Sequence, residues 1–155
     1  MERDREKLYL RQADRGDMML LYRWVNDPTV RKSAFKTKTI SLEEHKAWFF
    51  STLQKSDVKI FVLMHGKEAI GQVRLKIENR MQEIDYSIDV GMRGKGYGVR
   101  LLGLMEKVCS RNMPLVGKVK TDNIASQRVF ERLGYECKRE SDYYYIYRKD
   151  LLNVE

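Results

Sequence analysis

The chain has few cysteines and prolines, two of each among its 155 residues, and no long run of apolar residues. Cys109 and Cys137 lack metal-ligand spacing, so the sequence predicts no metal site, and both thiols are expected to be buried as small hydrophobic side chains. Without linker-like segments, one folded domain is predicted over residues 1–155, with its core at about 7–150. The apolar runs are far shorter than the ~20 residues of a membrane span, and no secretory leader follows the charged start. We therefore expect a cytoplasmic protein without a membrane partner.

The composition is strongly basic, with 30 lysines and arginines against 22 aspartates and glutamates and a net charge of +8. Such a charge suits an anionic partner, whether nucleic acid, an acidic membrane or a phosphorylated small molecule. The cations are spread along the chain, so most of them are expected to form a solvated surface. A small-molecule partner is favoured, and nucleic acid is not.

A glycine-rich loop between a predicted strand and a predicted helix is the most informative segment. Before it, Ile84, Tyr86, Ile88 and Val90 alternate with polar residues, which predicts a half-buried strand. After it, apolar spacing predicts a helix that begins near Tyr97. A helix start offers free N–H groups, and glycines let a bulky anion approach them, so the loop predicts a phosphate or pyrophosphate cradle. The cradle residues are Arg93, Gly94, Lys95, Gly96, Tyr97 and Gly98.

Three known glycine patterns do not fit this loop. The Walker motif requires Lys and Ser or Thr where Tyr97 and Gly98 stand. The dinucleotide fingerprint fails because Gly94, Gly96 and Gly98 are evenly spaced by two. The RNA-recognition signature begins in the same way as Lys95 to Gly98 but continues on a strand, whereas a helix is predicted here.

The pattern Arg93-x-x-Gly96-x-Gly98 resembles the acetyl-CoA loop of the GCN5-related N-acetyltransferase (GNAT) superfamily. A segment that opens with Asn123 and ends at Tyr135 resembles the family's second signature. The resemblance covers nearly the whole chain. It implies an α/β (α+β) fold with a central mixed, mostly antiparallel sheet, splayed at its middle, with helices on both faces, and acetyl-CoA as cofactor. Besides the cradle, the implied cofactor contacts are Ile88, Asp89, Val90, Asn123, Ser126 and Phe130.

Local patterns predict the remaining elements. A strand at 8–12 is followed by a helix with Asp14 or Asp17 as its cap, which ends at Pro28 and is followed by a loop. Ser41 and Glu44 form a capping box that opens a second helix. Further strands are expected at 58–64, 69–77, 115–121, 135–140 and 143–148, with a helix after Asn123.

The N-terminal third resembles acetyltransferases that modify nucleotide-linked amino sugars in bacterial nonulosonic acid synthesis. The resemblance rests on residues 24–31 (WVNDPTVR) and 40–49 (ISLEEHKAWF), although Val25 stands where many relatives have Arg. It implies that this region covers the acceptor, and that Arg31, Lys36 and His45 face a nucleotide diphosphate. Core packing is an alternative for the aromatic residues, and a place on the helix surface is one for His45. The implied acceptor contacts are Asn26, Arg31, Lys36, His45, Trp48 and Phe49.

Acyl transfer from a thioester to an amine needs no nucleophilic side chain. The protein must align the reactants, remove a proton and stabilise an oxyanion. Glu83 and Asp85 share one strand face, so either can relay the proton through water, and solvated surface carboxylates are the alternative. Many superfamily members donate a proton to the thiolate from a Tyr seven residues after the Asn, where Phe130 stands here. Tyr135 or a water is then the candidate donor.

Three functions follow, in order of preference. The first is an acetyl-CoA-dependent N-acetyltransferase acting on a nucleotide-linked amino sugar, which requires a basic pocket with an aromatic wall. The second is a ribosomal-protein-type amino-terminal acetyltransferase, since residues 123–135 resemble that branch as well. The third is a non-catalytic module that senses coenzyme A or binds nucleic acid, favoured by the missing tyrosine at Phe130. The sequence leaves a homodimer open.

Overall fold

The computed structural model describes residues 7–152. Its helices are α1 (Met18–Val25), α2 (Pro28–Ser33), α3 (Leu42–Thr52), α4 (Tyr97–Glu106) and α5 (Ile124–Arg132), with short 3-10 turns η2 (Arg15–Asp17) and η3 (Val90–Met92). Its strands are β1 (Leu8–Gln12), β2 (Val58–His65), β3 (Glu68–Glu78), β4 (Met81–Ile88), β5 (Leu115–Lys120), β6 (Glu136–Arg139) and β7 (Tyr144–Lys149).

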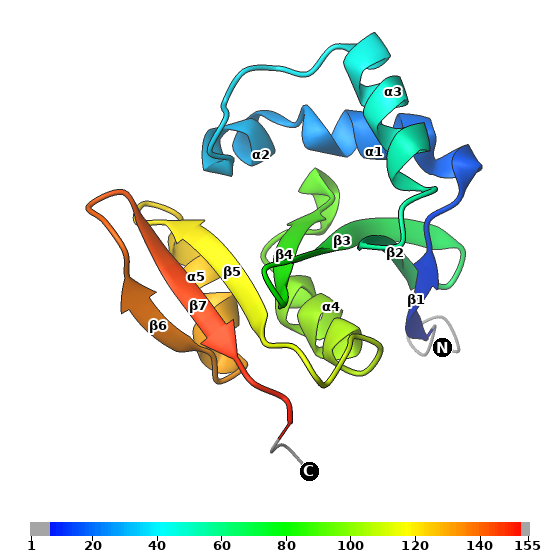
Figure 1. The fold of residues 1–155 in the computed structure, drawn as a ribbon. Coiled ribbons are helices and arrows are strands. Elements are labelled where there is room, and N and C mark those ends of the chain that lie inside the picture. Colours follow the sequence, from blue (N-terminus) through cyan, green and yellow to red (C-terminus); the bar gives the residue numbers. More distant parts are fainter. Residues whose placement is uncertain (1–6, 153–155) are drawn as a thin grey trace.

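The strands form one sheet in the order β1-β2-β3-β4-β5-β7-β6, in which only the β4–β5 pair is parallel. The first three helices lie on one side of the sheet, and α4 and α5 lie on the other (Figure 1). This arrangement confirms the expected mixed, mostly antiparallel sheet with helices on both faces. No helix within residues 7–152 is long and apolar enough to cross a membrane.

The sheet splays between β4 and β5. Along its other edge β4 is paired with β3 over its whole length, from Met81 to Ile88. Toward β5 it is paired only at Gln82 with Leu115 and at Glu83 with Val116. Beyond Glu83 the two strands diverge, which confirms the splay that the family resemblance implied.

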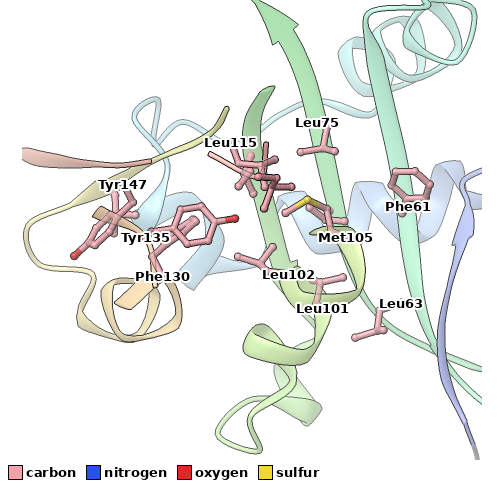
Figure 2. Close-up of a cluster of buried hydrophobic side chains, with 14 of the residues drawn as sticks. Phe61, Leu63, Leu75, Leu101, Leu102, Met105, Leu115, Phe130, Tyr135 and Tyr147 are labelled. Atoms are coloured by element: carbon pink, nitrogen blue, oxygen red, sulfur yellow. The ribbon is translucent and has the colours of Figure 1, made fainter. Parts of the chain in front are cut away.

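Each face of the sheet carries its own buried cluster. Under α1 and α3, Trp24 and Phe49 pack with Val62 of β2, and we call this side the α1–α3 face. On the opposite α4–α5 face, residues of both helices pack against β2 to β5 and β7 (Figure 2). Because cross-strand partners point to the same side, Arg74 and Asp85 lie on the α1–α3 face.

Local chemistry explains where the helices begin. The Ser41 hydroxyl accepts a hydrogen bond from the Glu44 amide, as expected for the start of α3. Residues after Pro28 were predicted to be loop, and this is wrong, because they form α2. The Asp27 carboxylate accepts hydrogen bonds from the amides of Thr29 and Val30, and Pro28 occupies the first helical position, where its missing N–H costs nothing.

Two smaller expectations are also corrected. Val90 was predicted to belong to the central strand, but it lies in η3 and is 67% exposed. Cys137 was predicted to be buried, but it is exposed on edge strand β6, while Cys109 is half-buried.

Candidate active site

The start of α4 forms an open cradle of backbone amides. Its N-cap is Gly96, which has a left-handed φ of 82° and no side chain to accept a hydrogen bond from the first turn. Gly94 has a φ of 77°, and a β-carbon on either glycine would have no heavy atom within 4 Å. By contrast, α2, α3 and α5 each begin at a side-chain cap. The amides at the start of α4 are therefore free to meet an anion.

The two cations of the cradle have different surroundings. Arg93 is turned back toward the protein, where Nε donates to the Ile88 carbonyl at 3.0 Å and Nη2 contacts Asp27 Oδ1 at 3.0 Å. Lys95 is exposed, and no ion pair within residues 7–152 involves it. In this structure Lys95 is the cation that can turn to a bound phosphate without losing a partner.

Beyond Glu83 a gap separates β4 from β5, and we call this gap the opening. The last residues of β4 leave backbone groups facing it. The Asp89 amide donates to Ile70 of β3 at 2.9 Å. Since consecutive residues of a strand direct their N–H and C=O groups to opposite sides, those of Ile88 point toward β5, which does not reach them. Its carbonyl accepts the Arg93 hydrogen bond, and its N–H faces the opening.

The Asp89 side chain fastens α1 to this loop. Its carboxylate accepts hydrogen bonds from Trp24 Nε1 at 2.8 Å and from the Gly91 amide at 3.0 Å. The Trp24 hydrogen bond is the main cause of a lowered pKa for Asp89, which keeps the carboxylate ionised. Asp89 thus joins the acceptor-side helices to the cradle.

Tyr86 of β4 also lies at the opening, and its role was missed in the sequence. Its hydroxyl is 2.9 Å from the Ser126 hydroxyl in the first turn of α5, and a β-carbon at Gly98 would lie 3.9 Å from the same oxygen. The ring meets Phe130 edge-on at 6.2 Å. Burial raises the pKa of Tyr86 to about 12, so the phenol keeps its proton at neutral pH.

The helix that carries Ser126 is positioned by its cap and its core contacts. The Asn123 side chain accepts a hydrogen bond from the Ser126 amide at 3.2 Å, so Asn123 caps α5. Phe130, predicted to contact the cofactor, is only 2% exposed and stacks on Tyr147 at 5.2 Å (Figure 2). In this structure its contacts are those of a core residue.

Tyr135, a candidate proton donor, lies near the C-terminal end of α4, far from the cradle at the start of that helix. Its buried hydroxyl is near Glu106, the last residue of α4, and its ring is 5.5 Å from Lys149 Nζ. The cradle precedes the first residue of that helix, so about 15 Å of helix separates them. Burial, followed by the charge of Glu106, raises the pKa of Tyr135. This placement argues against a proton-donor role.

On the α1–α3 face, two predicted site residues come together through a third. Arg74 of β3 contacts Asp85 Oδ2 at 3.1 Å, and its guanidinium lies 5.0 Å from the ring centroid of Trp48 on α3. Trp48 is 39% exposed and Asp85 is also exposed, at the edge of the opening. Glu83 lies on the same face, in the last pair before the strands diverge. Arg74 was missed because its importance depends on cross-strand pairing.

Asn26 and Arg31 are occupied in holding the segment between α2 and α3. Both ends of the Asn26 amide bond the backbone of Ile40 at 2.8 Å. Arg31 donates to the carbonyl groups of Val25, Lys36 and Lys38. Their side chains hold the segment between α2 and α3 in place, whereas Lys36 is exposed.

His45 and Phe49 are interior residues of α3. His45 is 2% exposed, its Nε2 donates to the Met18 carbonyl at 2.9 Å, and its ring stacks on Phe49. Burial lowers the pKa of His45, so the ring is neutral at physiological pH. These positions argue against the direct acceptor contacts predicted for both residues, and against His45 as a phosphate ligand.

Comparison with known proteins agrees with this geometry. A family model described as an acetyltransferase (GNAT) domain matches residues 7–136. Among solved structures, a domain from Methanocaldococcus jannaschii is 22% identical, with 94% of this chain and 99% of that chain covered and a TM-score of 0.80. Searched by sequence, the curated proteins contain no match to this chain.

Several of the similar structures have a stated substrate, among them a ribosomal protein and spermidine. The acetyltransferase from Salmonella typhimurium that modifies the N-terminal serine of ribosomal protein L7/L12 is 22% identical, covers 92% of this chain and 94% of its own, and has a TM-score of 0.77. Spermidine N-acetyltransferase from Vibrio cholerae, solved with CoA and spermine, is 21% identical, covers 91% and 92%, and has a TM-score of 0.77. Given the family match over most of its length, the chain belongs to the GNAT family of acetyl-CoA-dependent N-acetyltransferases.

Proposed function

We propose that this protein is a cytoplasmic enzyme that transfers the acetyl group of acetyl-CoA to the amine of a nucleotide-linked amino sugar. The observation that carries the proposal is the divergence of β4 and β5, with an open amide cradle at one side and the Asp85, Arg74 and Trp48 cluster at the other. Reactants that enter from opposite faces of the sheet would meet where the strands part.

The cradle fits the diphosphate of coenzyme A. Free amides at the start of α4 and Lys95 supply positive potential, and the bare glycines leave room for phosphate oxygens. The open amide of Ile88 is available to the pantetheine arm or to the thioester oxygen. Acetyl-CoA supplies an activated acyl group, and the chain supplies alignment, charge stabilisation and proton transfer.

The amine must lose a proton as it forms the new C–N bond. Asp85 and Glu83 stand on the acceptor side of β4, where either carboxylate can accept that proton through water. A sugar amine beside electron-withdrawing oxygens is expected to titrate more like an α-amine, with a reference pKa of ~7.7–8.0, than like lysine at ~10.4. A weak base is then sufficient.

The departing thiolate needs a proton, and Tyr86 is our candidate donor. Its hydroxyl meets that of Ser126, and its ring packs edge-on against Phe130, the position where the usual tyrosine of the family would stand. The raised pKa keeps Tyr86 protonated, and Ser126 orients the hydroxyl. Ser126 can also relay the proton, because it is both a donor and an acceptor.

A sugar acceptor is favoured by the exposed ring of Trp48 beside Arg74 and Asp85, since an aromatic face with polar neighbours suits a ring that is apolar on its faces and polar at its rim. Arg31 and His45 do not support a sugar acceptor, because their side chains are bonded to backbone carbonyl groups of the protein. The second candidate is a peptide amino terminus, because the fold resembles the Salmonella enzyme that modifies a ribosomal protein.

The test is release of free CoA thiol from acetyl-CoA with a panel of amines. The panel contains UDP-linked amino sugars, spermidine, an aminoglycoside and short peptides with free amino termini. The proposal expects the highest kcat/KM with a nucleotide-linked sugar. A clear preference for peptides would replace it with the second candidate, and absence of turnover with every amine, alongside salt-sensitive RNA binding, would support a non-catalytic module.

A further inference from the structure

The two strands that border the opening carry opposite charges on the α1–α3 face. Glu83 and Val116 form the last pair between β4 and β5. Two residues further along each strand, on the same face, stand Asp85 and Lys118. On this face β4 therefore presents two carboxylates to the opening, of which Asp85 is paired with Arg74, and β5 presents lysines.

The basic side continues across the neighbouring strands. Lys118 is paired with Ile146 of β7, which is paired in turn with Lys138 of edge strand β6. Lys120, the next residue of β5 on this face, is paired with Tyr144. We call Lys118, Lys120 and Lys138 the lysine bank.

The lysine bank is not part of the core beneath α1 and α3. The members of that buried cluster come from α1, α3 and β2, and none comes from β5, β6 or β7. Lys118 and Lys138 are exposed, and no ion pair within residues 7–152 involves either of them. Lys118 thus stands beside the opening without an ion-pair partner in the described part of the chain, and Lys138 extends the positive charge to the edge strand two positions further along the sheet.

Unlike Lys118 and Lys138, Lys120 makes contacts with α2 and the residues after it. Its Nζ donates to the Lys32 carbonyl of α2 at 2.9 Å and lies 6.0 Å from the ring of Phe35, which itself packs edge-on against Tyr144. These contacts hold α2 and the residues that follow it against β5. Lys118, one step nearer the last β4–β5 pair, keeps its charge available.

We propose that the lysine bank, through Lys118 above all, binds the anionic group of the acceptor while Asp85 and Glu83 face its amine. The acceptor class is then a small molecule with a phosphate or diphosphate at one end and a primary amine at the other. This rests on the proposed function and deepens it. It also gives a basic subsite at residues that the sequence did not single out, in place of Arg31 and His45.

Physical chemistry favours such a bipolar arrangement. The amine arrives mostly protonated and is attracted by the carboxylates of β4, while the phosphate is attracted by the lysines of β5. The two attractions orient the acceptor in one sense only, with its nitrogen toward the thioester. A single exposed charge contributes modestly, so reversal of Lys118 should weaken binding about fivefold to tenfold at low salt.

The experiment measures acceptor binding by calorimetry with protein saturated with CoA, so that the α4 cradle is already filled. The probes are UDP-glucosamine, UDP, which lacks the amine, and glucosamine, which lacks the anion. In Lys118→Glu we expect weaker binding of UDP-glucosamine and UDP and unchanged binding of glucosamine. The matched control is Lys59→Glu, an exposed strand lysine on β2 far from the opening. Equal affinity of wild type and Lys118→Glu for UDP-glucosamine would overturn the inference.

A turnover assay separates this inference from the proposed function. If UDP-glucosamine binds through Lys118 but no nucleotide-linked sugar is acetylated, the lysine bank stands and the proposed substrate does not. If nucleotide-linked sugars are acetylated with the same KM by Lys118→Glu, the proposed function stands and the lysine bank is wrong. A Lys118 effect confined to acidic peptides would also overturn it, because the occupant would then be a polypeptide.

Discussion

The two edges of β4 differ in how their backbone groups are satisfied. Eight residue pairs join one edge to β3, whereas two pairs join the other edge to β5. An exposed strand edge normally invites pairing with another chain. Here Arg93 takes up the Ile88 carbonyl on the open edge, and the contact between Tyr86 and Ser126 joins β4 to α5 beside it. The sealed edge provides rigidity, and the open edge provides groups that can bind a reactant.

The helices beside the open edge repeat this difference. The start of α5 is closed by the Asn123 cap, while the start of α4 has only Gly96. A capped start has one amide already satisfied, and an uncapped start keeps its amides for a ligand. If this contrast marks the cofactor site, then changes at the open edge should affect function, and changes elsewhere should affect stability alone.

The largest effect is expected for Gly96→Val. A β-branched residue is strained at a φ of 82° and would close the cradle, so that charge-assisted hydrogen bonds to the diphosphate are lost. Each such bond contributes about 1.5–3 kcal/mol. Loss of two corresponds to at least about a hundredfold weaker binding of CoA, measured by calorimetry.

Gly134→Val is the matched control for backbone strain. Gly134 follows α5 with a φ of 83°, and a β-carbon there also meets no heavy atom within 4 Å. The two variants should lose similar stability in a denaturant titration, whereas CoA affinity should fall only in Gly96→Val. Unchanged affinity in Gly96→Val would mean that the diphosphate lies elsewhere.

The second effect is on the chemical step and compares two buried tyrosines. Tyr86→Phe removes the hydroxyl at the opening and should lower kcat about a hundredfold, the lower range for a general acid. Tyr135→Phe removes a buried hydroxyl near Glu106 and should leave kcat unchanged. Steady-state kinetics with acetyl-CoA and the best amine decide between them. The reverse result would restore Tyr135 as the proton donor.

The third effect concerns β5, on the other side of the opening, and lowers the free energy of unfolding. A β-carbon at Gly117 of β5 would lie 2.4 Å from the Phe130 ring, so Gly117→Ala must displace either the strand or α5. Overpacking of this kind costs about 1–3 kcal/mol, measurable by urea unfolding. Phe130→Leu should remove the clash, so the double variant should be more stable than the sum of the single changes predicts. Simple additivity would contradict the assigned contact.

Much of the fold follows from local sequence patterns. The alternation in β4, the glycines before α4 and the cap at Ser41 act over a few residues, and the structure confirms the elements that they predict. The helix α2 was missed because Asp27 and Pro28 were interpreted as the end of α1. The same pair is equally suited to begin a helix, and only the chain that follows decides between the two.

The site was less predictable, because side-chain roles depend on distant partners. Arg31 has the charge for a phosphate, but its partners are carbonyl groups of its own loop. Asn26 is tied to Ile40 in the same way. Backbone features are different, since positive φ angles at Gly94 and Gly96 are demanded by the local turn. Gly94 and Gly96 therefore have the backbone geometry that a phosphate cradle requires, and the contact of the cradle residues with the cofactor stays a prediction.

His45 gives the smallest effect and tests the covered side of the sheet. Burial lowers its pKa in the folded protein below the ordinary value near 6.5. Between these two values the unfolded chain binds more protons than the folded one, so the free energy of unfolding decreases as the pH falls. We expect Tm to drop by a few degrees from about pH 7.5 to about pH 5.5, part of it due to His45.

The variant His45→Gln separates packing from acceptor binding. Glutamine can still donate to the Met18 carbonyl but does not titrate, so the pH dependence of Tm should become shallower, while Tm at neutral pH falls with the lost ring contacts. KM for the acceptor should stay close to the wild-type value, because the ring has no surface open to a ligand. A raised KM for the acceptor, with an unchanged pH dependence of Tm, would instead make His45 part of the acceptor site. The side of α3 that carries His45 would then belong to the open, ligand-binding part of the protein and not to its sealed part.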